Sequence, residues 1–137
     1  MPFVIKAHIA DPQAKSFAFA AHKTMYDGKR IAVGDVAFVF ASENEGGSGL
    51  IARAIVTSVE PVARRQGIAR QTPRVSVTLE RTARTNGRLG RGELKRFTNW
   101  NDGRPETELN FKLYRQATDK IVGISDETAA FLGEFFA

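Results

Sequence analysis

The segment Val36-Ala37-Phe38-Val39-Phe40-Ala41 decides the fold class, because it would be apolar on both faces of an extended chain. A strand of this kind is covered on both sides and lies in the middle of a sheet. The turn-forming pair Gly34-Asp35 precedes it, and the glycine-rich stretch 42–49 follows it as a loop. Residues 50–59 then return as a second strand. The sequence therefore predicts a central β-hairpin with a long, glycine-bearing tip.

Shorter strands are predicted on both sides of this hairpin. Residues 3–9 and 75–81 alternate between apolar and polar side chains, which is typical of strands with one buried face. In the first of them the alternation places Lys6 and His8 on the exposed face. Weaker strand patterns occur at residues 110–115 and 120–124.

The last segment has the clearest helical pattern. Ser125 can cap it, because a serine hydroxyl accepts a hydrogen bond from a free amide of the first turn. Asp126 and Glu127 then stand where the helix dipole favours negative charge. One face carries the apolar side chains at helical spacing, namely Phe131, Leu132, Phe135 and Phe136. We expect this face to pack on the sheet.

These elements predict a mixed α+β fold that is mainly β. Several strands with few helices, in no regular alternation, favour a small barrel or mixed sheet over a doubly wound sheet. We expect about five or six strands, a C-terminal helix and short peripheral helices. The length of 137 residues fits a single domain, 1–137.

The composition excludes several classes of site. The chain has no cysteine, which excludes disulfides, thiolate zinc sites and cysteine nucleophiles. Its two histidines, His8 and His22, show no metal-binding spacing, so we expect neither a metal nor a cofactor. The two common glycine-rich phosphate loops are missing. With no leader and no apolar run of about 20 residues, a soluble, cytoplasmic protein without membrane contact is expected.

Basic residues are concentrated in one part of the chain. Between residues 62 and 96, ten basic residues stand against two acidic ones, a net charge of +8, whereas the whole chain carries +5. Nine of the ten are arginine, whose planar guanidinium group matches phosphate. The segment predicts a polyanionic partner, with nucleic acid as the first candidate. The residues expected to contact phosphates are Arg64, Arg65, Arg70, Arg74, Arg84, Arg88, Arg91 and Arg96.

Two aromatic residues lie in polar, irregular parts of the sequence. Trp100 stands between Asn99 and Asn101, close to arginines, and Tyr26 precedes an acidic residue and a glycine. Rings in such loops provide surfaces on which bases stack, with about 1–3 kcal/mol per base. The alternative for Trp100 is that it plugs the open end of the barrel. Phe40, by contrast, belongs to an apolar strand and is expected in the core.

The order of the segments carries a family resemblance. Val33-Gly34-Asp35-Val36 leads into the aromatic strand that ends at Ser42, and the small-residue strand 50–56 follows. Phe111-Lys112-Leu113-Tyr114-Arg115-Gln116 and the segment 121–125 close the series. This order resembles the EVE domain of the PUA-like superfamily over about three-quarters of the chain. The family's tryptophan-bearing opening strand and its Trp-x-Gly-Val-Arg pattern are absent.

This resemblance implies a pseudo-barrel that binds DNA or RNA and holds a flipped or modified base in an aromatic pocket. The residues that match the wall of that pocket are Phe40, Ser42, Arg115 and Gln116, with Tyr26 and Trp100 as stacking candidates. The arginine-rich segment would lie beside the pocket and contact the phosphates of the same strand.

Two alternatives remain open at the level of sequence. Lys23-Thr24, about ten residues ahead of Gly34-Asp35, resembles ASCH domains, which are also PUA-like. That resemblance implies an amidohydrolase acting on an acylated cytidine, with Thr24 as the nucleophile, Lys23 as its activator and Glu80 as the acid or base. The other alternative is an interaction domain whose arginines dock on an acidic protein partner.

Overall fold

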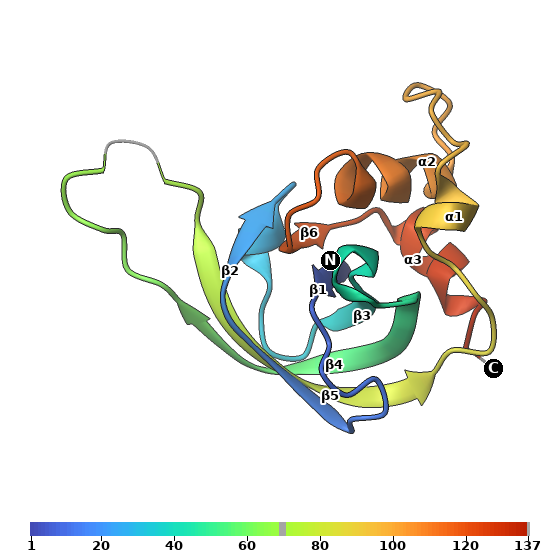
Figure 1. The fold of residues 1–137 in the computed structure, drawn as a ribbon. Coiled ribbons are helices and arrows are strands. Elements are labelled where there is room, and N and C mark those ends of the chain that lie inside the picture. The colour runs from blue at the N-terminus through green and yellow to red at the C-terminus, as the bar shows by residue number, and fades with distance from the viewer. Residues whose placement is uncertain (69–70, 137) are drawn as a thin grey trace.

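The computed structural model describes residues 1–68 and 71–136. In this part of the chain six strands close into a barrel in the order β1-β3-β4-β5-β2-β6 (Figure 1). The strands are β1 (Phe3–Ala7), β2 (Ser16–Met25), β3 (Val36–Ala41), β4 (Gly49–Pro61), β5 (Arg74–Arg84) and β6 (Lys120–Gly123). The fold is mainly β with a few short helices, as predicted.

The barrel is mixed in strand direction. β1 pairs in parallel with β3, and β6 pairs in parallel with β2, whereas every other neighbouring pair is antiparallel. β3 and β4 form the hairpin that the apolar segment predicted, with Val36 opposite Ile55 and Ala41 opposite Gly49. The longer hairpin is formed by β4 and β5, and the described residues of its connection project away from the barrel (Figure 1).

Short helical segments complete the described structure, and α1, α2 and α3 gather on one side of the barrel (Figure 1). They are the 3₁₀ turns η1 (Gly28–Arg30) and η2 (Glu43–Glu45), the helices α1 (Arg91–Leu94), α2 (Pro105–Leu109) and α3 (Asp126–Gly133), and the π-helical turn η3 (Asn110–Tyr114). The strand predicted at 110–115 is wrong. Leu109 and Leu113, four residues apart on a helix that Pro105 begins, are both fully buried.

The apolar core has two layers because β1 and β3 are covered on both faces. Phe3, Ile5 and Val39 belong to the layer that fills the barrel. Phe38 and Phe40 belong to the layer between the barrel and the helices. Phe40 is in the core, as expected, but both rings lie in the layer that the helices cover.

Lys6 departs from its prediction, because the face of β1 expected to be exposed is covered. Its side chain is fully buried, and its Nζ donates a hydrogen bond of 2.9 Å to the carbonyl of Leu113 in η3. An alternating pattern shows which residues share a face of a strand, but it does not show what covers that face.

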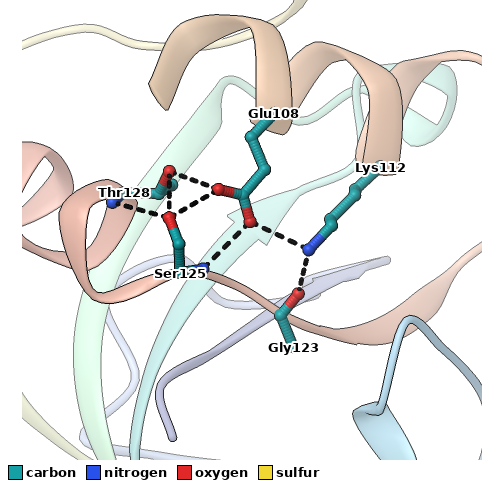
Figure 2. A network of polar contacts seen from close by, with 5 residues as sticks. All are labelled: Glu108, Lys112, Gly123, Ser125 and Thr128. Carbon is teal, nitrogen blue, oxygen red and sulfur yellow. Dashed lines mark hydrogen bonds and ion pairs between the residues drawn. The ribbon is translucent and has the colours of Figure 1, made fainter. Parts of the chain in front are cut away.

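The start of α3 is capped as predicted and is tied to α2 (Figure 2). The hydroxyl of Ser125 accepts a hydrogen bond of 3.2 Å from the amide of Thr128. The carboxylate of Glu108 accepts hydrogen bonds of 2.6 Å from the hydroxyl groups of Ser125 and Thr128. It also accepts one of 2.8 Å from Lys112 Nζ. Lys112 also donates to the carbonyl of Gly123 in β6. This network fixes α2 and α3 on the barrel.

Among the described residues, no helix has the length and apolar character needed to span a bilayer.

Candidate nucleic-acid interface

Three of the six residues predicted to bind a base lie together around Phe111. The rings of Tyr26 and Trp100 contact it edge-on, with centroids 5.9 and 5.3 Å away. The guanidinium carbon of Arg115 lies 4.1 Å from the centroid of the same ring. We call Tyr26, Trp100, Phe111 and Arg115 the aromatic cluster. Trp100 is 44% exposed and Tyr26 38%, so both rings are at the surface and Trp100 does not plug the barrel.

A shallow pocket of about 240 Å³ adjoins the aromatic cluster, and Trp100, Arg104 and Phe111 line it. Phe111 was missed as a binding residue. Phe111 belongs to the segment 110–115, which was predicted to be a strand. A strand there does not predict a contact with Trp100, whereas the observed turn η3 places the two rings together.

The other three predicted residues lie elsewhere. Phe40 is fully buried beneath the helices, so it does not line a surface pocket and its predicted role is wrong. Ser42 is 1% exposed, and its hydroxyl has no hydrogen-bond partner in the described part of the chain. Gln116 is exposed, and its carbonyl accepts a hydrogen bond of 3.3 Å from Lys120 Nζ. These three residues therefore do not form a pocket wall with Tyr26 and Trp100.

A second hollow, of about 500 Å³, lies where β2, the loop after β3 and the loop before β6 meet. We call it the polar pocket, lined by Ala20, Ala21, His22, Lys23, Glu45, Arg74, Ala117, Thr118 and Asp119. A β-bulge in β2 shapes it, because one extra residue stands between Phe19 and His22 relative to β5. Ala21 in this bulge has a φ of 52°, a conformation that residues other than glycine rarely adopt. Bulges of this kind redirect side chains and occur beside binding sites.

Two buried acceptor atoms of the polar pocket lack a donor. His22 Nδ1 lies 3.2 Å from the carbonyl of Ala20, which can only accept, so this nitrogen carries a hydrogen and, in the neutral ring, Nε2 is an acceptor. Among the described residues, neither His22 Nε2 nor Asp119 Oδ1 has a hydrogen-bond partner. The other oxygen of Asp119 accepts from the amide of His8 at 3.4 Å. The pocket therefore offers two acceptors to a ligand that brings N–H groups.

The carboxyl group of Glu45 stands at the rim of this pocket. A hydrogen bond with Asp119, which requires a proton between the two carboxyl groups, raises the pKa of Glu45. His8 Nδ1 lies 3.6 Å from Glu45 Oε2. While Glu45 is ionised it cannot donate to Asp119, and the acceptor on Asp119 stays open.

Glycine holds the loop that carries Glu45. The amide of Gly47 donates a hydrogen bond of 2.8 Å to the carbonyl of Ser42, and a Cβ atom on Gly47 would lie 2.5 Å from the carbonyl carbon of Ala41. The Tyr114 hydroxyl donates to Glu43 in the same loop at 3.0 Å. The loop is thus fixed from both sides, and the rim of the pocket is preorganised.

Two lysines lie side by side on the strands behind the polar pocket. Lys6 on β1 is directly opposite Lys120 on β6, and both side chains are buried. Burial, together with the charge of Lys6, lowers the pKa of Lys120 to about 8. Burial also lowers the pKa of Lys6, against the opposing effect of the Asp119 carboxylate. No sequence pattern indicates the polar pocket, because its residues come from separate segments that meet only in the folded barrel.

The arginines predicted to contact phosphates are divided between two ends of the molecule. Arg64, Arg65 and Arg74 line a cleft of about 750 Å³ between the β4–β5 hairpin and β2. Arg74 begins β5 and Arg84 ends it, so that the two are about 33 Å apart at ~3.3 Å per residue. Arg70 lies outside the described residues.

The remaining four arginines lie at and beyond the far end of β5 and contact neighbouring side chains. Arg84 donates a hydrogen bond to Gln13, and Arg88 pairs with Glu93 at 3.9 Å. Arg91 donates to Asn44 at 2.7 Å. The guanidinium carbon of Arg96 lies 4.9 Å from the ring centroid of Phe97. The expectation that all eight form one surface beside the aromatic pocket is therefore wrong. The reason is that β5 carries the basic segment along the whole length of the barrel.

Comparison with known proteins identifies the fold. No protein-family model matches the chain, and no curated protein is significantly similar in sequence. The DUF55 domain of human thymocyte nuclear protein 1 matches with a TM-score of 0.62 at 12% identity, over 96% of both chains. A Pseudomonas putida protein matches with 0.64 at 13%, over 98% of this chain and 99% of that one. The chain has the same PUA-like barrel fold as these structures. A structure of the human THYN1 protein in complex with DNA containing 5-methylcytosine shares this PUA-like fold, with a TM-score of 0.58 at 12% identity over 96% and 94% of the chains.

The PUA-like barrel separates the three residues of the hydrolase alternative. Thr24 is paired with Ile121 of the barrel interior, and its hydroxyl donates a hydrogen bond of 2.8 Å to the carbonyl of Pro73. Lys23 is the adjacent residue of β2 and points to the opposite face. Glu80 is exposed and lies opposite Ser16, at the other end of β2. The arrangement of a lysine, a threonine and a glutamate at one site is therefore wrong for these residues.

Proposed function

We propose that this PUA-like domain binds nucleic acid and holds one unpaired base in the polar pocket. The observation that carries the proposal is the pair of buried acceptors without donors, His22 Nε2 and Asp119 Oδ1. An unsatisfied buried polar group costs about 1–3 kcal/mol, and a ligand that supplies N–H groups recovers this energy. The exocyclic amino groups of cytosine and adenine are such donors, and a carboxylate is the usual acceptor for the amino group of cytosine.

A protein of the same fold also supports nucleic acid as the ligand. The human THYN1 protein, which has this fold, has been solved in complex with DNA that contains 5-methylcytosine. A base that carries an amino group fits two acceptors, whereas uracil and thymine would turn a carbonyl oxygen toward one of them. We therefore propose that the polar pocket prefers an amino-bearing base over its keto counterpart.

A pair of single-stranded oligonucleotides that differ only in one cytosine or uracil tests this proposal. We expect the cytosine strand to bind at least about tenfold more tightly, because one wrong base typically costs about 1–3 kcal/mol. Asp119→Asn should remove most of this preference, since the amide can donate where the carboxylate only accepts. Asp126→Asn, on the exposed first turn of α3, is the matched control. Equal affinity of the wild type for the two strands would contradict the proposal.

The aromatic cluster offers a stacking surface for a second base of the same strand. Trp100 is exposed, and Arg104 and Arg115 lie beside it to meet a phosphate. We expect Trp100→Ala to weaken oligonucleotide binding by about 1–3 kcal/mol. The melting temperature should stay close to that of the wild type, because the ring is at the surface. A variant that melts earlier but binds as before would show that Trp100 serves packing alone.

A further inference from the structure

The β4–β5 hairpin and β2 enclose a cleft in which every charged side chain among the described lining residues is cationic. The cleft has a volume of about 750 Å³, and five of the residues that line it are cationic, namely Lys23, Lys29, Arg64, Arg65 and Arg74. None of the described residues that line it is acidic. Phosphate groups of a nucleic-acid strand are the anions that such a run of cations attracts.

The hairpin that forms one wall is held in place by its own polar contacts. The side chain of Gln71 accepts from the amide of Arg65 at 2.9 Å, and its amide group donates to the carbonyls of Arg65 and Ile68 at 2.6 and 3.2 Å. The amide of Val62 donates to the carbonyl of Arg74 at 3.0 Å, so that the hairpin pairing continues past the end of β4. Arg64 and Arg65 therefore stand in a part of the hairpin that hydrogen bonds cross-link.

The opposite wall belongs to β2, and the same strand also borders the polar pocket. Ala21, Lys23 and Arg74 line both hollows. Arg74 donates to the carbonyl of Ala21 at 2.8 Å, and both the amide and the hydroxyl of Thr24 donate to the carbonyl of Pro73. These contacts join the base of the hairpin to β2, directly beside the polar pocket.

We propose that the β4–β5 hairpin is a phosphate clamp, which holds the backbone of the strand whose base enters the polar pocket. This inference rests on the proposed function and adds to it the path of the strand. The backbone runs between the hairpin and β2, and the walls shared by the two hollows let a base turn from the cleft into the pocket. The arginines at the far end of β5 take no part in this contact.

Two double variants of equal charge change test the clamp. Arg64→Gln with Arg65→Gln neutralises the hairpin, and Arg84→Gln with Arg88→Gln neutralises two exposed arginines at the far end of β5. The affinity for a cytosine-containing single strand is measured between about 50 and 200 mM salt. On single strands the slope of log K against log salt changes by about 0.7 for each lost phosphate contact. We expect the slope to become shallower by about 1.4 in the hairpin variant and to stay at the wild-type value in the far-end variant.

A third variant, Lys29→Gln, probes the other wall of the cleft from the exposed turn η1, and its slope should become shallower by about 0.7. Equal slope changes in the two double variants, or no change in the hairpin variant, would overturn the clamp. If the hairpin variant keeps the wild-type slope while Asp119→Asn still removes the preference for cytosine, the clamp fails and the proposed function stands. If the wild type binds no oligonucleotide, both fail.

Discussion

At the residue scale, Lys120 shows how the barrel end places charge in an apolar setting. The residue is 2% exposed, and its Nζ donates over 3.3 Å to the carbonyl of Gln116. Lys6 lies directly opposite on β1, and its positive charge adds to the effect of burial on the pKa of Lys120. A buried amine in such a position destabilises the folded state in its charged form.

The substitution Lys120→Met should therefore stabilise the protein at neutral pH. The folded pKa of Lys120, about 8, lies below its ordinary value of 10.5, so between these values the unfolded state binds more protons. The free energy of unfolding then rises with pH across this window, by up to about 3 kcal/mol at about 1.4 kcal/mol per pKa unit. We expect Lys120→Met to raise the free energy of unfolding by roughly 1–3 kcal/mol at pH 7. The variant should also lose much of the increase in this free energy that the wild type shows toward pH 10.

Urea denaturation at the two pH values measures this effect. Lys29→Met is the control, because Lys29 is exposed on η1 and its substitution leaves the burial of charge unchanged. A loss of stability in Lys120→Met at pH 7, with the control unchanged, would show that the buried ammonium group stabilises the fold.

At the element scale, the polar link between α2 and α3 centres on the carboxylate of Glu108. Burial raises the pKa of Glu108, but hydrogen bonds from Lys112, Ser125 and Thr128 outweigh it, and the net effect lowers the pKa. A group whose pKa is lowered by folding stabilises the folded state above its unfolded value. That stabilisation is lost as the pH falls through the folded pKa.

Ser125→Ala should cost about 1–2 kcal/mol of unfolding free energy, because it removes the cap of α3 and one donor to Glu108. A double-mutant cycle with Glu108→Gln should give a coupling energy of about 0.5 kcal/mol or more. Both variants are followed by urea denaturation at neutral pH and again below pH 4, where the cost of Ser125→Ala should shrink. Strictly additive losses at neutral pH would show that the cap and the carboxylate act independently.

At the scale of the whole molecule, the barrel sets two hollows side by side, and Arg84 and Arg88 line neither of them. The polar pocket and the cleft share the wall that β2 provides and both include Arg74 at the start of β5, whereas Arg84 stands at the opposite end of that strand. The net charge of +5 favours the approach of a polyanion, and the proposed clamp confines the lasting phosphate contacts to the cleft.

The salt dependence of binding by the wild type measures how many such contacts form. If about four phosphates are engaged, the slope of log K against log salt should lie near −3 on a single strand, at about −0.7 for each phosphate, and near −4 on a duplex. Fluorescence anisotropy with single-stranded and duplex oligonucleotides of one sequence gives both values. An affinity that does not change with salt would exclude phosphate contacts as a source of binding energy.

Local sequence determined the elements of this protein. The apolar run 36–41 is β3, the alternating segment 75–81 lies within β5, and Ser125 caps α3, because side-chain periodicity and capping depend on neighbouring residues. The order of these segments also indicated the PUA-like fold. Residues 110–115 were mistaken for a strand because their buried leucine belongs to a helical pattern that begins at Pro105.

Only the tertiary structure decided which distant residues share a site. His22, Glu45 and Asp119 come from three separate segments, and they meet because the barrel closes and a bulge turns His22 toward the other two loops. The arginines looked like one surface in sequence, but an extended strand of eleven residues carries them to opposite ends of the barrel. Periodicity reports the face on which a side chain lies. What covers that face, and which loop stands across from it, follows from packing between segments far apart in the chain.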